Sequence, residues 1–107
     1  MDDFNNSKTN IVIMKKINLN QEFTDCFGTI IAGEKISDAI AKHLYLGKGI
    51  SSENGDEKYA AYKLSAKIVT AKDKVECTPE EIALIKKMAA VGFTPGAYGQ
   101  ILDLLEQ

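Results

Sequence analysis

The stretches Thr78-Pro79-Glu80-Glu81 and Thr94-Pro95-Gly96-Ala97 are two copies of one helix-start signal near the end of the chain. In each, the threonine hydroxyl can accept a hydrogen bond from a free amide at the helix N-terminus, and the proline takes the first helical position, where no amide partner is lost. Gly92 lies between them, at the place where a glycine in the left-handed conformation ends a helix. The sequence therefore predicts two helices, residues 79–91 and 95–106, joined by a tight corner.

Two further helices are predicted before this pair. Ser37 is a candidate N-cap and Gly47 a candidate C-terminal glycine for a helix over residues 37–46. Asp56 is a candidate cap for an amphipathic helix over residues 57–71. The side chains expected to face the core from the second of these helices are Ala61, Tyr62, Leu64, Ile68 and Val69.

The N-terminal part of the chain has the alternation of a β-strand. Ile17 and Leu19 share one face of this strand, with polar residues between and beside them. Turn-forming residues follow from Asp25 to Gly28, so a β-hairpin is expected over residues 15–32. Val75 and Cys77 flank Glu76, which suggests a short extended stretch over residues 75–77 that could add to this hairpin. The predicted fold class is α+β and mostly helical, with this hairpin packed on four helices.

Residues 1–13 are largely polar and offer little to bury, so we expect a disordered tail there and a single globular domain over residues 14–107. Met14 is a second candidate start of translation, and whether Met1 or Met14 is the native start is left open. No apolar run approaches the roughly 20 residues of a membrane span, and no signal peptide is recognisable. These features predict a cytoplasmic protein without membrane contact.

The charged residues and the cysteines narrow the classes of partner. All thirteen basic residues are lysines, and the net charge is -2. Arginine is the usual residue for bidentate contacts with guanine and phosphate, so its absence argues against sequence-specific nucleic-acid binding. Cys26 and Cys77 are too few for a disulfide framework and are expected as reduced, part-buried thiols, with a bridge between them as the alternative.

The chain carries no recognisable catalytic or cofactor motif. Gly47-Lys48-Gly49 follows a predicted helix and lacks the spacing of a phosphate-binding loop. His43 is the only histidine, so a zinc site built from it and the two cysteines would lack a fourth ligand. We therefore expect no enzyme activity, no cofactor and no metal.

The corner Gly92-Phe93-Thr94 also fits a helix-turn-helix, in which the last helix would read DNA. That helix carries Asp103 and Glu106 and no lysine, whereas specific DNA binding normally uses several cationic contacts. The densest lysine cluster lies instead over residues 58–74, where we expect a solvated helix face, with a surface for an acidic partner or for nonspecific nucleic-acid binding as the alternative. A small DNA-binding regulator remains the alternative function.

The two C-terminal helices offer more apolar side chains than one packing neighbour needs. A second chain could cover part of this surface, and the other interpretation is that the protein's own core covers all of it. The candidate partner-binding residues are Leu84, Met88, Phe93 and Tyr98.

Three short stretches carry a resemblance to a group of known proteins: Lys16-Ile17-Asn18-Leu19-Asn20, the turn residues Asp25 and Gly28, and Ala97-Tyr98-Gly99-Gln100-Ile101. They resemble small uncharacterised proteins carried by bacteriophages, prophages and related mobile elements, and the resemblance covers residues 15–106. It implies a bacterial, intracellular setting and brings no catalytic residues. We therefore expect an accessory factor that binds a host or phage protein or forms a homodimer. The identity of the partner and the oligomeric state are left open.

Overall fold

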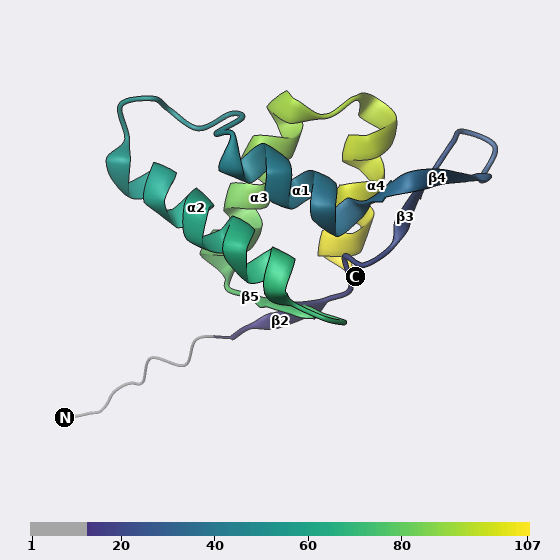
Figure 1. The fold of residues 1–107 in the computed structure, drawn as a ribbon, viewed down its shortest axis with the longest axis horizontal. Helices are drawn as coiled ribbons and strands as arrows, with labels where there is room; N and C mark the ends of the chain where they lie inside the picture. The colour runs from purple at the N-terminus through teal and green to yellow at the C-terminus, as the bar shows by residue number, and fades with distance from the viewer. Residues whose placement is uncertain (1–12) are drawn as a thin grey trace.

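The computed structural model describes residues 13–107, which fold as four helices and two small antiparallel sheets (Figure 1). The predicted class, α+β and mostly helical with a hairpin packed on the helices, is confirmed. The expected tail, residues 1–13, lies outside the described residues except for Ile13. The elements in chain order are β2 (Lys15–Ile17), β3 (Glu22–Thr24), β4 (Ile30–Lys35), α1 (Ile36–Tyr45), α2 (Gly55–Thr70), β5 (Val75–Cys77), α3 (Pro79–Gly92) and α4 (Pro95–Glu106).

The first described strand, β2, pairs with β5, the short extended stretch that the sequence suggested could join the N-terminal strands, and not with the returning strand that the sequence predicted. Ile17 lies opposite Val75 in an antiparallel register. These two side chains and that of Cys77 are buried, so the pairing brings two apolar strand faces together against the helices. The hairpin consists of β3 and β4, so its predicted bounds, residues 15–32, are wrong and its pairing runs within residues 22–35.

Helix α3 is central to the fold. It contacts α1, α2, α4 and β5, and α1 crosses in front of it in Figure 1. Ile85, Met88 and Ala89 of α3 are fully buried. The hydrophobic core around them takes side chains from all four helices, from both strands of the β2–β5 sheet and from the segment after β2. Its large members outside α3 are Ile17, Leu19, Ile36, Ile40, Leu44, Leu64, Ile68, Val75, Ile101 and Leu105.

Helix α1 begins at Ile36, one residue before the predicted cap at Ser37, and the side chain of its N-cap residue Lys35 makes no capping hydrogen bond. Backbone carbonyls satisfy the first amides instead. The Ile36 N–H donates to the carbonyl of Gln21 at 2.7 Å, and the Ser37 N–H donates to the carbonyl of Leu19 at 2.8 Å. Because these carbonyls already serve the helix start, no side-chain cap is needed.

Two other predicted helix boundaries are also wrong. Asn54, and not Asp56, caps α2, since its side-chain oxygen accepts the Glu57 N–H at 3.0 Å. Gly92 does not adopt the left-handed conformation, and α3 continues through it. A Cβ atom at Gly92 would lie 2.7 Å from Cδ2 of His43, so glycine is required there for close packing between helices and not for a turn.

The two predicted threonine caps differ in the structure. The Thr78 hydroxyl accepts the Glu81 N–H at 3.1 Å, and the Glu81 carboxylate accepts the Thr78 N–H at 2.8 Å, which completes a capping box. Thr94 occupies the N-cap of α4, but its side chain makes no capping hydrogen bond. The start of α4 therefore depends on Pro95 and on packing.

Thr78→Ala is expected to lower the free energy of unfolding by about 1 kcal/mol, because an amide at the start of α3 loses its acceptor. Thr94→Ala is the matched control and is expected to cost less than about 0.5 kcal/mol, because no cap hydrogen bond is lost. Urea unfolding followed by circular dichroism measures both values. Equal losses in the two variants would contradict this difference between the helix starts.

Candidate functional site

The partner-binding residues proposed from the sequence are not gathered on an exposed face. Leu84 and Met88 are 8% and 0% exposed and belong to the protein's own core. Phe93 and Tyr98 are half-buried and pack against that core. The wide apolar stripe of α3 is explained by its several packing neighbours, so a partner is not needed to cover Leu84 and Met88.

Phe93 and His43 form a stacked pair. Their ring centroids are 4.2 Å apart, with an angle of 17° between the ring planes. Nδ1 of His43 lies 2.8 Å from the carbonyl oxygen of Ala39, so this ring nitrogen is hydrogen-bonded within α1. The absence of a side chain at Gly92 leaves the space that the imidazole occupies. In this arrangement His43 packs α1 against the α3–α4 corner.

An apolar groove, the α1–α2 groove, lies on the exposed side of the first two helices. Its apolar lining comes from Ala41 and Tyr45 of α1 and from Tyr62, Ala66 and Val69 of α2, and its volume is about 430 Å³. Tyr45, Tyr62 and Val69 are 68%, 54% and 65% exposed. Three large apolar side chains therefore surround one depression, an arrangement that marks interaction sites on protein surfaces.

The sequence missed this groove because it placed Tyr62 and Val69 in the core. Both predictions are wrong: α2 buries a narrow row that includes Leu64 and Ile68, and each following residue is rotated by about 100° around the helix axis. Val69 is therefore turned away from the core that Ile68 enters. The spacing of Tyr59, Tyr62 and Val69 along one helix face is the signal that could have revealed a second apolar row.

Aromatic rings dominate one end of the groove. The Tyr62 ring centroid lies 6.3 Å from that of Tyr45 and 6.2 Å from that of Tyr59. The ammonium of Lys63 lies 4.8 Å from the Tyr59 ring centroid, within the range of a cation–π interaction. Lys58 and Lys63 thus flank Tyr59 and Tyr62 along this part of α2.

The charges in the lining of the groove are balanced, and further lysines lie beside it on α2. Lys42 and Asp38 line it, and the Lys42 ammonium is 2.6 Å from the Glu34 carboxylate. That hydrogen bond raises the pKa of Lys42. After its acidic first turn, α2 carries lysines and no carboxylate, and within the part of the chain that the structure describes Lys58 and Lys63 make no ion pair.

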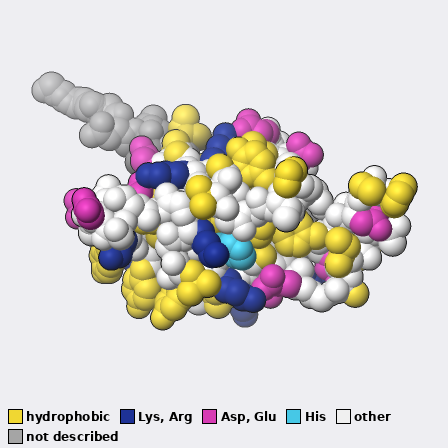
Figure 2. Space-filling model, turned by 90° about the horizontal axis from the view of Figure 1, so that it is seen from above, with side chains coloured by type: hydrophobic (Ala, Val, Ile, Leu, Met, Phe, Trp, Pro, Cys, Tyr) yellow, Lys and Arg dark blue, Asp and Glu magenta, His cyan; other side chains and the backbone are white. Residues whose placement is uncertain are grey.

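The β3–β4 hairpin projects from the opposite end of the molecule to α2 (Figure 1). Its hairpin end, defined as Phe27, Ile30 and Ile31, exposes 89%, 62% and 51% of these side chains. One oxygen of Asp25 accepts the N–H groups of Phe27 and Thr29, both at 2.9 Å, and so stabilises the turn. Figure 2 shows hydrophobic side chains gathered along one side of the body and at the end of the hairpin.

A single side chain fastens the hairpin to α4. Oε1 of Gln100 accepts the Thr24 N–H at 2.8 Å, and Nε2 of Gln100 donates to the Thr24 carbonyl at 3.0 Å. The side-chain amide thereby offers Thr24 the donor and the acceptor that a neighbouring strand would offer. Gln100 thus holds β3 at its last residue, opposite Ile30 of β4, and the turn that follows extends into solvent.

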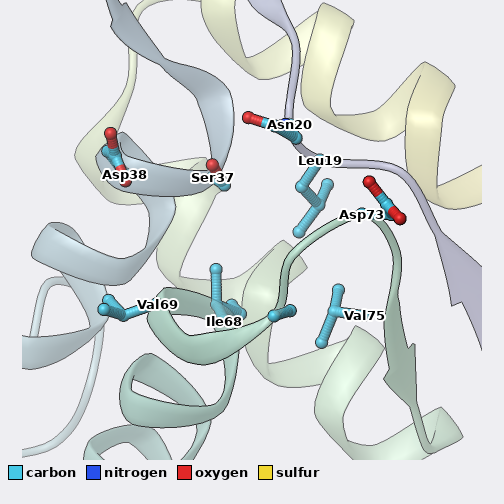
Figure 3. A pocket seen from close by; sticks show the side chains of 9 residues that line it. Leu19, Asn20, Ser37, Asp38, Ile68, Val69, Asp73 and Val75 are labelled. Carbon is cyan, nitrogen blue, oxygen red and sulfur yellow. The ribbon is translucent and has the colours of Figure 1, made fainter.

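A smaller polar cavity of about 210 Å³ lies where α1 begins beside the segment that leads into β5 (Figure 3). Asn20, Ser37, Asp38 and Asp73 contribute its polar groups, and Figure 3 shows the two aspartates on opposite sides of it. In residues 13–107, no three His, Cys, Asp or Glu side chains are close enough together to hold a metal ion. The carboxylates of this cavity therefore do not converge on one point.

Two glycines of the loop after α1 allow its backbone to adopt a left-handed conformation. Gly47 and Gly49 have φ angles of +77° and +71°. The Lys48 N–H donates to the His43 carbonyl, and the Ile50 N–H donates to the Gly47 carbonyl, both at 3.1 Å. Amides that a phosphate group would need are thus engaged inside the loop.

Cys26 and Cys77 are both free thiols, so the alternative of a bridge between them is not observed. Cys26 is exposed in the hairpin turn, where the sequence suggested partial burial, and Cys77 is buried in β5. Burial raises the pKa of Cys77 to about 11, and the nearby Glu81 carboxylate acts in the same direction.

Alkylation near neutral pH is expected to modify one thiol in the folded chain, that of Cys26, and both thiols after unfolding. The thiolate is the reacting form, and a buried group with a pKa of about 11 supplies little of it. Peptide mapping by mass spectrometry after iodoacetamide treatment measures both sites. If Cys77 in the folded protein reacted as fast as Cys26, its burial in β5 would be refuted.

None of the helices within residues 13–107 is long and apolar enough to cross a membrane. Comparison of the chain with protein-family models, with curated proteins and with solved structures finds no match. The candidate site is accordingly defined by this chain's own geometry, which consists of the α1–α2 groove and the projecting hairpin end.

Proposed function

We propose that this protein is a non-catalytic protein-interaction domain that docks another protein chain in the α1–α2 groove. The observation that carries the proposal is the cluster of Tyr45, Tyr62 and Val69, each more than half exposed around one apolar depression. Covering an apolar side chain of this size stabilises a complex by roughly 1.5–3 kcal/mol before the costs of association. Covering these side chains with a partner is therefore energetically favourable.

The chemistry of the groove favours a projecting apolar side chain with a carboxylate nearby. Tyrosine is enriched among the residues that dominate binding energy, because its ring offers a large contact area and its hydroxyl a hydrogen bond. Lys58 and Lys63 lie on the same helix as Tyr62 and favour an acidic neighbour in the partner. These two requirements define the class of partner.

The setting that we propose for this domain is an accessory factor of a phage or mobile element in the bacterial cytoplasm, acting on a protein of the host, of the phage or of its own kind. The support for this setting is the resemblance to small bacteriophage and prophage proteins. The alternative, a DNA-binding regulator, gains no support from α4, which carries Asp103 and Glu106 and no lysine.

Site-directed photo-crosslinking tests the docking proposal. A photoreactive phenylalanine analogue replaces Tyr62 in the groove or, as the control, Asp103 on the exposed side of α4. We expect a defined adduct from position 62 and none from position 103 in the cells that carry the gene. Mass spectrometry identifies the partner, and the purified partner should then bind the unmodified protein directly.

Two matched valines make the test specific. Val69→Lys places a charge in the groove, whereas Val91→Lys places the same charge at a similarly exposed site on α3, since the two valines are 65% and 68% exposed. Val69→Lys should abolish the adduct and the direct binding, and Val91→Lys should preserve both. Absence of any adduct at position 62, or equal loss in the two lysine variants, would refute the proposal.

A further inference from the structure

We propose that the occupant of the α1–α2 groove is the hairpin end of a second copy of this chain. This inference rests on the proposed function, because it names the partner of the same groove. It predicts that the protein associates with itself through a contact between two different surfaces, the hairpin end of one copy and the groove of the next.

The hairpin end has the shape of a docking group. Phe27 is 89% exposed at the far end of a two-stranded arm, and Ile30 and Ile31 beside it are more than half exposed. Asp25 fixes the turn through two hydrogen bonds, so the aromatic side chain is presented from a defined backbone. A preorganised turn loses little conformational freedom when it docks.

The groove is large enough for this group. A closed apolar cavity of roughly 150 Å³ binds benzene in a well-studied protein. The volume of the α1–α2 groove, about 430 Å³, therefore has room for the Phe27 ring and for a neighbouring isoleucine side chain. Its lining of tyrosine, alanine and valine matches them in polarity, and the Tyr45 and Tyr62 rings offer faces for aromatic contact.

The charges of the two surfaces are complementary. Residues 21–34, which contain the whole hairpin turn, carry three carboxylates and no lysine. The Asp25 carboxylate lies two positions from Phe27, so docking of the phenyl ring brings this carboxylate to the rim of the groove. Asp38 and the Glu34-paired Lys42 offset each other in the groove lining. The positive charge therefore comes from Lys58 and Lys63, which lie beside Tyr59 and Tyr62 on α2.

The hairpin end of one chain lies away from the groove of the same chain, so contact between these two surfaces needs a second copy. Gln100 holds Thr24, the last residue of β3, on α4, and the turn beyond Thr24 projects away from α2 (Figure 1). A protrusion and a pocket at different places on one surface form a heterologous contact, which closes into a ring or continues as a chain of molecules. In a closed ring every groove is occupied. In an open chain of molecules, every groove except the one at the end is occupied.

Sedimentation velocity over a concentration series is the first test. The unmodified protein is expected to sediment as a mixture that shifts toward larger species as its concentration rises. Phe27→Ala and Val69→Lys should each weaken this association by about tenfold or more, as expected for a central apolar contact. Val91→Lys serves as the control and should leave it unchanged. All three sites are exposed, so the variants fold alike, which circular dichroism verifies.

Disulfide trapping between two copies is the second test, and it uses the natural thiol beside Phe27. One copy is unmodified and supplies Cys26; the other carries Cys26→Ser and Ala66→Cys on the α2 wall of the groove. A mild oxidant should join the two copies through the thiols at positions 26 and 66. Ala83→Cys, at an exposed alanine on α3, is the matched control and should give little product. Cys77 does not compete because it is buried.

The outcomes separate this inference from the proposed function. A protein that stays monomeric at every concentration, or an association that Phe27→Ala leaves unchanged, overturns the second-copy proposal. Equal trapping at positions 66 and 83 overturns it as well. If position 62 then crosslinks to a different protein, the groove remains a docking site with another occupant. If position 62 crosslinks to nothing, both proposals fail.

Discussion

Gly49→Ala is expected to be the most damaging glycine substitution in the described chain, lowering the free energy of unfolding by about 3 kcal/mol or more. Two causes combine. Gly49 has a φ of +71°, where an L-residue is strained, and a Cβ atom there would lie 2.8 Å from the carbonyl oxygen of Lys87 and 3.2 Å from Cα of Met88. Both contacts are with backbone of a central helix, which cannot move aside as a flexible side chain would.

Gly47→Ala separates the two causes. Gly47 has nearly the same φ, +77°, but a Cβ atom there would meet nothing within 4 Å. This variant should therefore lose only the conformational part, about 1 kcal/mol. Urea unfolding of both variants gives the difference, which reports the contact between the loop after α1 and the backbone of α3. If the two losses were equal, that contact would be absent in solution.

Met88→Ala is expected to cost about 2–5 kcal/mol, because it empties a fully buried site at the centre of the core. Val91→Ala, one turn further along α3 and 68% exposed, should change stability by less than about 0.5 kcal/mol. Thermal and urea unfolding measure both. The comparison decides between a core role for Met88 and the partner-binding role suggested by the sequence, since a surface methionine would behave like Val91.

The helices could be predicted because their signals are local. Thr78, Pro79 and Glu81 carry the start of α3 within four positions, and the capping box forms as that spacing requires. The strand pairing could not be predicted in the same way. The alternation around Ile17 indicates a strand but does not name its partner, which lies near Val75 after two intervening helices. Pairing between distant strands is decided by which apolar faces meet over the finished core.

The candidate site was harder to predict than the fold. Periodicity shows that α2 and α3 are apolar on several sides. How deeply each side is buried depends on the elements that pack against it, and the sequence pattern does not give their positions. α3 is surrounded, so Leu84 and Met88 are buried; α2 lies at one side of the molecule, so Tyr62 and Val69 are exposed. Gly92 is a further example. The sequence indicated that a glycine matters at this position, but it could not show that the His43 ring packs against it.

The attachment of the hairpin by Gln100 has a consequence for protein synthesis. Thr24 and Gln100 are 76 positions apart, so the hairpin emerges from the ribosome long before the side chain that holds it. Until α4 has been translated, Phe23 and the rest of β3 lack the surface on which they finally pack. Nascent chains truncated before Gln100 should therefore expose the hairpin to proteases or chaperones along its whole length, and completion of the chain should confine that exposure to the hairpin end.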